Sequence, residues 1–197
     1  MPENSERKTL YLIGGTMGVG KTAVCRQLKK DLPRSVFLDG DWCWDADPFI
    51  VTAETKEMVL ENICFLLNQF LRCSVYRNIL FCWVMDRQST LDSILQCLDT
   101  AGCRIQCISL TAEPECIRAR LAADIKAGLR SADVIERSIA RIPLYASLNT
   151  LKIDTSHKSI RMTAGEIRNL QVSGSSAGRT GRRQGNIPRI QGAEEKP

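Results

Sequence analysis

The chain has 197 residues, of which 44% are hydrophobic and 25% charged, and its formal net charge is +5. This length and composition indicate one globular domain with a sizeable buried core. Positions 171–197 hold five basic and two acidic residues, so most of the excess positive charge lies at this end of the chain. The remainder is close to neutral, which argues against a basic nucleic-acid surface on the folded part.

The cysteines argue against a disulfide framework. There are nine, an odd number, and the opening sequence MPENSERK has no apolar leader segment. No C-x-x-C pair occurs and His157 is the single histidine, so the spacing of a structural zinc site is missing. No apolar run approaches the ~20 residues that a bilayer requires. We therefore expect reduced thiols, no membrane partner and a cytoplasmic location.

Apolar runs and helical patterns alternate along the chain. Strands are predicted at 9–13, 35–38, 78–85, 104–110 and 150–153, and helices ending near residue 31 and at about 54–71, 89–98, 114–128, 132–140 and 163–170. Capping boxes are predicted at Ser89 with Asp92 and at Thr163 with Glu166. The alternation predicts an α/β fold, with a five-stranded parallel sheet and helices on both faces. The expected organisation is a flexible segment at 1–7, a domain at 8–171 and a disordered basic tail at 172–197.

The first strand leads into the motif G-x-x-x-x-G-K-[ST], at residues 15–22, and a helix-forming run follows. In this context backbone N–H groups and the positive end of the helix cradle phosphates, so the domain is predicted to have the three-layer P-loop NTPase fold. Lys21 is predicted to contact the β- and γ-phosphates of ATP, and Thr22 to bind a Mg²⁺ that bridges them. The candidate nucleotide-binding residues are Gly15, Thr16, Met17, Gly18, Val19, Gly20, Lys21 and Thr22.

Two carboxylates follow the second strand, in the sequence Asp39-Gly40-Asp41. In a parallel sheet this strand end lies at the same edge as the phosphate loop. Side chains two residues apart and separated by a glycine can diverge, so one carboxylate can serve the metal while the other faces an acceptor. A hydroxyl that attacks a γ-phosphate needs such a carboxylate to orient it and to take its proton.

Residues 9–41, TLYLIGGTMGVGKTAVCRQLKKDLPRSVFLDGD, resemble the start of P-loop small-molecule kinases. This group includes shikimate, gluconate, adenylylsulfate and nucleoside monophosphate kinases and chloramphenicol phosphotransferase. Shikimate kinases have Asp-x-Asp at the end of their second strand, and adenylylsulfate kinases have a similar Asp-Gly-Asp. The resemblance implies that Asp39 lies near Mg²⁺ through water and that Asp41 binds the acceptor and acts as the base.

Kinases of this group also close an arginine-bearing lid over the triphosphate, which assigns such a role by position to the arginines after the fourth strand. Arg118 and Arg137 are the preferred catalytic candidates, while solvent-exposed ion pairs with neighbouring acids are the alternative for each of them. The part that three other arginines play is left open: Arg120, Arg130 and Arg141.

Two further polar positions follow later strands. Asp86, after the third strand, is a candidate for binding near the metal ion, although the neighbouring Arg87 can neutralise the charge of its carboxylate. In the kinases that the chain resembles, adenine rests against the loop after the fifth strand, which makes residues 155–157 a candidate for the adenine pocket. His157 is interpreted as an exposed loop histidine.

The acceptor is only partly defined by the sequence. The segment WCWDADPF, residues 42–49, supplies aromatic rings and carboxylates next to Asp41, and no basic residue occurs between Asp39 and Glu54. This absence argues against an acceptor that carries a phosphate. The predicted function is ATP- and Mg²⁺-dependent transfer of the γ-phosphoryl group to a hydroxyl of a small molecule. Alternatives are an ATP-binding regulatory module with little phosphotransfer and nucleic-acid binding by the tail.

Overall fold

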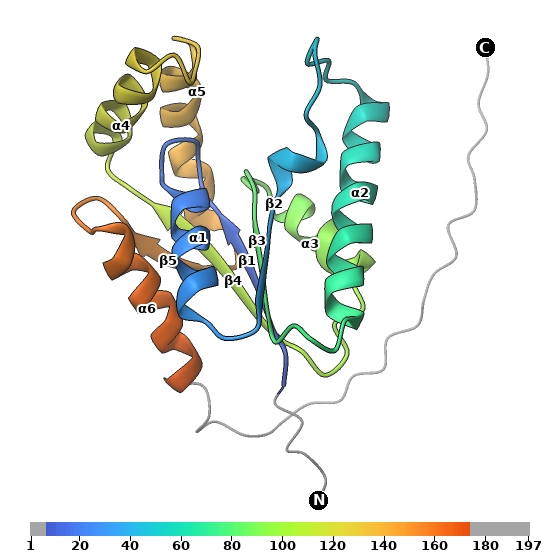
Figure 1. Cartoon of the computed structure of the whole chain (residues 1–197). Coiled ribbons are helices and arrows are strands. Elements are labelled where there is room, and N and C mark those ends of the chain that lie inside the picture. The colour runs from blue at the N-terminus through green and yellow to red at the C-terminus, as the bar shows by residue number, and fades with distance from the viewer. Residues whose placement is uncertain (1–6, 174–197) are drawn as a thin grey trace, which may run out of the picture.

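The computed structural model describes residues 7–173, in which strands and helices alternate along the chain (Figure 1). The predicted tail at 172–197 and the N-terminal segment at 1–7 lie almost entirely outside these residues. In chain order the elements are β1 (Thr9–Gly14), α1 (Lys21–Asp31), β2 (Ser35–Asp39), the 3-10 helix η1 (Gly40–Cys43), α2 (Ala53–Arg72), β3 (Asn78–Cys82), α3 (Gln88–Cys97), β4 (Arg104–Thr111), α4 (Pro114–Lys126), α5 (Val134–Arg141), the 3-10 helix η2 (Ile142–Ser147), β5 (Leu151–Asp154) and α6 (Ile160–Ser173).

The five strands form one parallel sheet in the order β2-β3-β1-β4-β5. Alternate side chains of the central strand β1 enter two separate cores, because successive residues of a strand point to opposite faces. Tyr11 and Ile13 pack with α1, α4 and α6, whereas Leu10 and Leu12 pack with α2 and α3. The predicted three-layer P-loop fold is therefore confirmed.

Strand β3 is shorter than predicted, because it ends at Cys82 rather than at Met85. The pairing of β3 with both of its neighbours ends at this level, where Ile13 of β1 and Asp39, the last residue of β2, pair with Cys82. One further hydrogen bond joins Trp83 N to the Ile13 carbonyl at 3.3 Å. The apolar residues that follow therefore become a loop above the sheet edge.

Both predicted capping boxes are wrong. Helix α3 begins at Gln88, and Asp92 accepts a side-chain hydrogen bond from Gln88 at 2.8 Å instead of serving as a capping partner of Ser89. Helix α6 begins at Ile160, where Ser159 Oγ accepts from the Met162 N–H at 3.2 Å. The capping box that does form lies at the start of α2, between Thr52 and Thr55.

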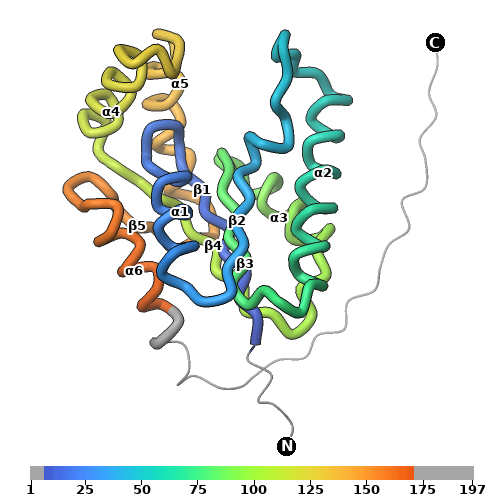
Figure 2. Tube along the Cα trace, in the orientation of Figure 1, coloured from blue at the N-terminus to red at the C-terminus, as the bar shows by residue number. Residues whose placement is uncertain are grey.

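Two parts of the chain rise above the carboxyl ends of the strands (Figures 1 and 2). One consists of α4 and α5, and the other is the segment at 44–52 between η1 and α2. The phosphate loop lies between them, so residues from several elements surround it. Within residues 7–173, no helix combines the length and the apolar character needed to cross a membrane. The nine cysteines all lie in this range and are free thiols.

Candidate active site

The loop between β1 and α1 folds as the motif requires. Gly18 has φ +79°, and a Cβ added there would lie 2.7 Å from Leu121 Cγ, so the position demands glycine on both conformational and steric grounds. Gly20, at φ +101°, precedes α1 and provides no side-chain cap. The first N–H groups of α1 are therefore free of a capping side chain at the end of the helix that favours anions. Lys21 Nζ donates to the Thr16 carbonyl at 2.9 Å, within the loop.

Asp39 connects α1 to the end of β2. Its side chain is buried, with 5% of the residue exposed, and Oδ2 accepts a 2.6 Å hydrogen bond from Thr22 Oγ1. Oδ1 accepts from the Asp41 N–H at 3.2 Å, which fixes the turn between the two carboxylates. A hydroxyl and a carboxylate in contact form the oxygen donor set that Mg²⁺ prefers beside a nucleotide. Thr22 and Asp39 therefore fit the metal role predicted for them.

Asp41 and Lys21 influence each other's protonation. Partial burial and the nearby Asp39 charge raise the pKa of Asp41, while Lys21, Arg130 and a hydrogen bond from Trp83 oppose the rise. The residue as a whole is nevertheless exposed to solvent. Burial lowers the pKa of Lys21, and the two carboxylates offset this in part. A carboxylate whose pKa is raised is a better proton acceptor.

Two adjoining cavities meet at Asp41. The first, of about 280 Å³, is the phosphate cavity, and the second, of about 460 Å³, is called here the inner acceptor cavity. Both are bounded by Met17, Asp41 and Val84. The remaining residues of the phosphate cavity are Gly18, Gly20, Lys21, Thr22, Ala23, Asp39, Arg120, Asp124 and Arg130. Lys21, Thr22, Asp39 and Asp41 thus line one cavity together with Met17, Gly18 and Gly20. Gly15, Thr16 and Val19, which the motif also proposed for nucleotide binding, do not line it.

The structure distributes the arginines differently from the sequence prediction. Arg118 forms a 2.8 Å ion pair with exposed Glu136 and lines neither of these cavities. Arg120 and Arg130 line the phosphate cavity instead. Arg137 lines the inner acceptor cavity rather than the phosphate cavity, and its Nε contacts the Asp133 carboxylate at 2.9 Å. Arg120 and Arg130, rather than Arg118, therefore line the cavity around the phosphate loop, where Arg130 Nε contacts the Asp124 carboxylate at 3.2 Å.

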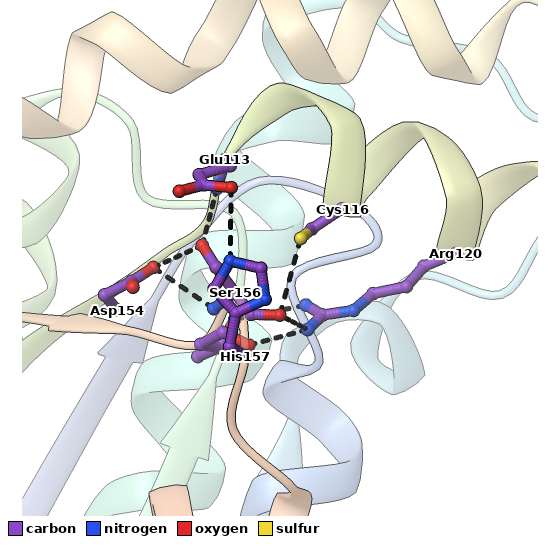
Figure 3. A network of polar contacts seen from close by, with 7 residues as sticks. Glu113, Cys116, Arg120, Asp154, Ser156 and His157 are labelled. Carbon is purple, nitrogen blue, oxygen red and sulfur yellow. Dashed lines mark hydrogen bonds and ion pairs between the residues drawn. The ribbon is translucent and has the colours of Figure 1, made fainter.

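Arg120 reaches from α4 to the loop that follows β5 (Figure 3). Its guanidinium donates to the carbonyls of Thr155, at 2.6 Å, and Ser156, at 3.4 Å. Thr155 Oγ1 in turn donates to the Val19 carbonyl of the phosphate loop, at 3.2 Å. This loop and the phosphate loop are thus held together, while His157 lies outside the cavity and contacts the Glu113 carboxylate at 3.4 Å.

Helix α5 is tied to the phosphate loop and to the end of β3. Thr16 Oγ1 donates a buried 2.9 Å hydrogen bond to the Ser138 carbonyl. One turn later, Arg141 forms an ion pair with Asp86, whose side chain is only 12% exposed. Asp86 does not line the phosphate cavity, so the structure pairs this carboxylate with an arginine outside the cavity that Thr22 and Asp39 line.

The walls of the inner acceptor cavity come from three parts of the chain. Trp44, Phe49 and Val51 belong to the segment expected to surround the acceptor, and Trp44 packs on Phe49 with ring centroids 4.6 Å apart. Trp42 instead packs edge-on against Phe37. Trp83 was missed because the sequence placed it inside β3. Arg141 was left open, since nothing local indicates the direction of its side chain.

Comparison with known proteins places the chain in a family. Residues 12–138 match a family described as an AAA domain. No curated protein sequence matches the chain. Among solved structures, the tunicamycin resistance protein of Deinococcus radiodurans is 18% identical, with a TM-score of 0.66, and the match covers 84% of this chain and 96% of that protein.

Shikimate kinase from Acinetobacter baumannii, solved with shikimate, is 21% identical, with a TM-score of 0.61 over 88% of this chain and 97% of that one. The APS kinase of Mycobacterium tuberculosis, solved with AMPPNP and APS, is 16% identical, with a TM-score of 0.56 over 84% and 98%. These structures share the fold of this chain and confirm its resemblance to P-loop kinases. Because the family match spans more than half of the chain, the protein belongs to the AAA domain family.

Proposed function

We propose that the protein is a kinase that uses ATP and Mg²⁺ to phosphorylate a hydroxyl group of a small molecule. The observation that carries the proposal is the position of Asp41, which lines both the phosphate cavity and the inner acceptor cavity. A carboxylate at this junction can reach a hydroxyl on one side while the γ-phosphate lies on the other. The shared fold of shikimate kinase and APS kinase supports the same reaction class.

The residues divide the work of phosphoryl transfer. The loop N–H groups and Lys21 bind the β- and γ-phosphates, and Arg120 and Arg130 balance the charge that develops on the transferred group. Mg²⁺, held by Thr22 and through water by Asp39, would neutralise charge on the phosphate oxygens. Asp41 orients the acceptor hydroxyl and accepts its proton. The acceptor oxygen bonds to the γ-phosphorus, the bond from this phosphorus to the β–γ bridging oxygen breaks, and ADP leaves.

Replacing Asp41 by asparagine tests the proposal. Asp41→Asn keeps the size of the side chain but removes the proton acceptor, so kcat should fall by about 100-fold or more. The dissociation constant for AMPPNP should stay within about twofold, because the loop and Lys21 are unchanged. The acceptor for this assay is found by thermal-shift screening of hydroxylated compounds in the presence of AMPPNP, since a ligand that binds the folded state raises its melting temperature.

Asp45→Asn is the matched control, because Asp45 is an exposed carboxylate of the same segment that lines neither cavity. Its kcat should equal that of the wild type. An unchanged kcat in Asp41→Asn would remove the base assignment. If AMPPNP binds but no screened compound leads to ADP release from ATP, the results would favour a regulatory nucleotide-binding module instead.

A further inference from the structure

A third cavity continues the inner acceptor cavity away from the phosphates. It measures about 660 Å³ and shares five residues with the inner one, among them Trp44, Trp83 and Val84. We call it the outer cavity. Each compartment alone has the size of a small-molecule site, for which the usual range is about 300–1,000 Å³. An acceptor whose hydroxyl lies at Asp41 therefore has room to extend past the two tryptophans.

The outer cavity is strongly basic. Its lining contains four basic side chains, which are Lys56, Arg87, Arg137 and Arg141, and one acidic side chain, Asp86. The Asp86 charge is already balanced by Arg141, and Arg137 contacts Asp133. Lys56 and Arg87 are exposed, and within residues 7–173 no hydrogen bond or ion pair engages either side chain.

These two cations come from different elements. Lys56 lies in the first turns of α2, and Arg87 immediately precedes α3. Both face a cavity whose other walls include Trp44, Trp83 and Leu60. Apolar walls of low dielectric focus the field of nearby charges into the space that they enclose. An anion at this position therefore gains more electrostatic stabilisation than it would beside a lysine and an arginine on an open surface.

Resting on the proposed kinase function, we propose that the acceptor is an elongated hydroxy compound with an anionic group at its far end. The hydroxyl lies at Asp41, an apolar ring or chain lies between Trp44 and Trp83, and a carboxylate or phosphate contacts Lys56 and Arg87. The transfer step is the one described above, and the anionic end takes no part in the bond changes. The sequence argument against a phosphate-bearing acceptor considered only residues 39–54, whereas Lys56 and Arg87 come from other elements.

The test uses the full chain and a panel of aromatic hydroxymethyl carboxylates. Within the panel the carboxylate is joined to the ring directly or through a short chain of methylenes, and each acid is paired with its methyl ester. Isothermal titration calorimetry in the presence of AMPPNP measures binding without turnover. For at least one chain length, the acid should bind at least tenfold more tightly than its ester.

The double variant Lys56→Gln/Arg87→Gln should reduce this preference to about twofold or less. Both side chains are exposed, so the variant is expected to fold, and its AMPPNP affinity checks this independently. Lys30→Gln is the matched control, because Lys30 is an exposed lysine of α1 that lines none of the three cavities. The preference should be unchanged in Lys30→Gln. Equal binding of acids and esters, no binding by any acid, or a preference that survives the double variant would each overturn the inference.

Product formation separates this inference from the proposed function. ADP release and phosphorylated product are measured with the same acids and esters. If acids and esters are phosphorylated with equal kcat/KM, the kinase function stands and the anionic subsite is wrong. If acids bind with the expected preference and no product forms from any compound, the subsite stands and the kinase assignment is wrong.

Discussion

Gly40→Ala should destabilise the fold through a single side chain, that of Trp83. An added Cβ at Gly40 would lie 2.5 Å from Trp83 Cγ and 2.6 Å from Cδ1. Carbon atoms in favourable contact are about 3.5–4.0 Å apart, so the indole must move by roughly 1 Å. Overpacking of this kind costs about 1–3 kcal/mol. Trp83 lines both the inner acceptor cavity and the outer cavity, so movement of its indole also changes the shape of these cavities.

Urea unfolding measures the loss of stability as a lower midpoint at an unchanged slope. The near-UV circular dichroism of the tryptophans should change as well, because Trp83 leaves its position. The dissociation constant for AMPPNP should stay within about twofold, since Trp83 does not line the phosphate cavity. These three readouts together distinguish a local displacement from general unfolding.

Gly165→Ala is the control, because Gly165 lies in α6 and a Cβ there would meet no atom within 4 Å. Alanine is favoured over glycine inside a helix by roughly 0.5–1 kcal/mol, so this variant should be slightly more stable than the wild type. A Gly40→Ala protein with the urea midpoint and the near-UV spectrum of the wild type would refute the reasoning, since it would mean that Trp83 is not held against Gly40.

Two further predictions concern ion pairs and pH. Arg141→Met leaves the largely buried Asp86 carboxylate unpaired and should lower the unfolding free energy by about 1–3 kcal/mol. Arg118→Met should lower it by at most about 1 kcal/mol, because its partner Glu136 is exposed. Equal losses of unfolding free energy in urea would contradict the difference in burial. The value of kcat/KM should fall at acid pH with an apparent pKa above the ordinary aspartate value of 3.8, because Asp41 must be ionised to accept a proton and its pKa is raised. A pH profile with its acid limb at or below that value would argue against Asp41 as the base.

The phosphate side of the site could be predicted because its signals are local. The loop at 15–22 and the carboxylates at 39–41 each occupy a few consecutive residues, and the rule that ligands gather at the carboxyl ends of parallel strands brings them together. The contact of Thr22 with Asp39 follows from this placement. The exact end of β3 could not be predicted in the same way, because it depends on where its pairing with β1 and β2 stops.

The choice among the arginines shows what periodicity can and cannot supply. In α4 the buried residues Ile117 and Leu121 define the inward face, and at ~100° per residue Arg118 and Arg120 flank this face at similar angles on its two sides. Arg118 reaches Glu136 from one side, whereas Arg120 reaches the loop after β5 from the other. Helical spacing therefore did not distinguish the two arginines, and only the assembled fold shows which of them lines the phosphate cavity. Arg130 follows the end of α4, where no repeating pattern predicts the direction of a side chain.

The acceptor side was harder to predict because its residues are far apart in sequence. Lys56, Arg87 and Arg141 come from α2, the turn before α3, and α5, and only the assembled fold places them around one cavity. Residues 42–54, which directly follow Asp41, contain aromatic and acidic groups and no basic residue. The sequence therefore predicted the residues of the phosphate cavity better than the basic lining of the outer cavity.

The hydrogen bond from Thr16 to the Ser138 carbonyl connects the phosphate loop to α5. Ser138 follows Arg137, which lines the inner acceptor cavity, so this bond links the walls of the two cavities. If the protein is the proposed kinase, binding at one cavity can therefore affect binding at the other. By thermodynamic reciprocity, a donor that tightens the grip on the second substrate must itself be held more tightly once that substrate is present.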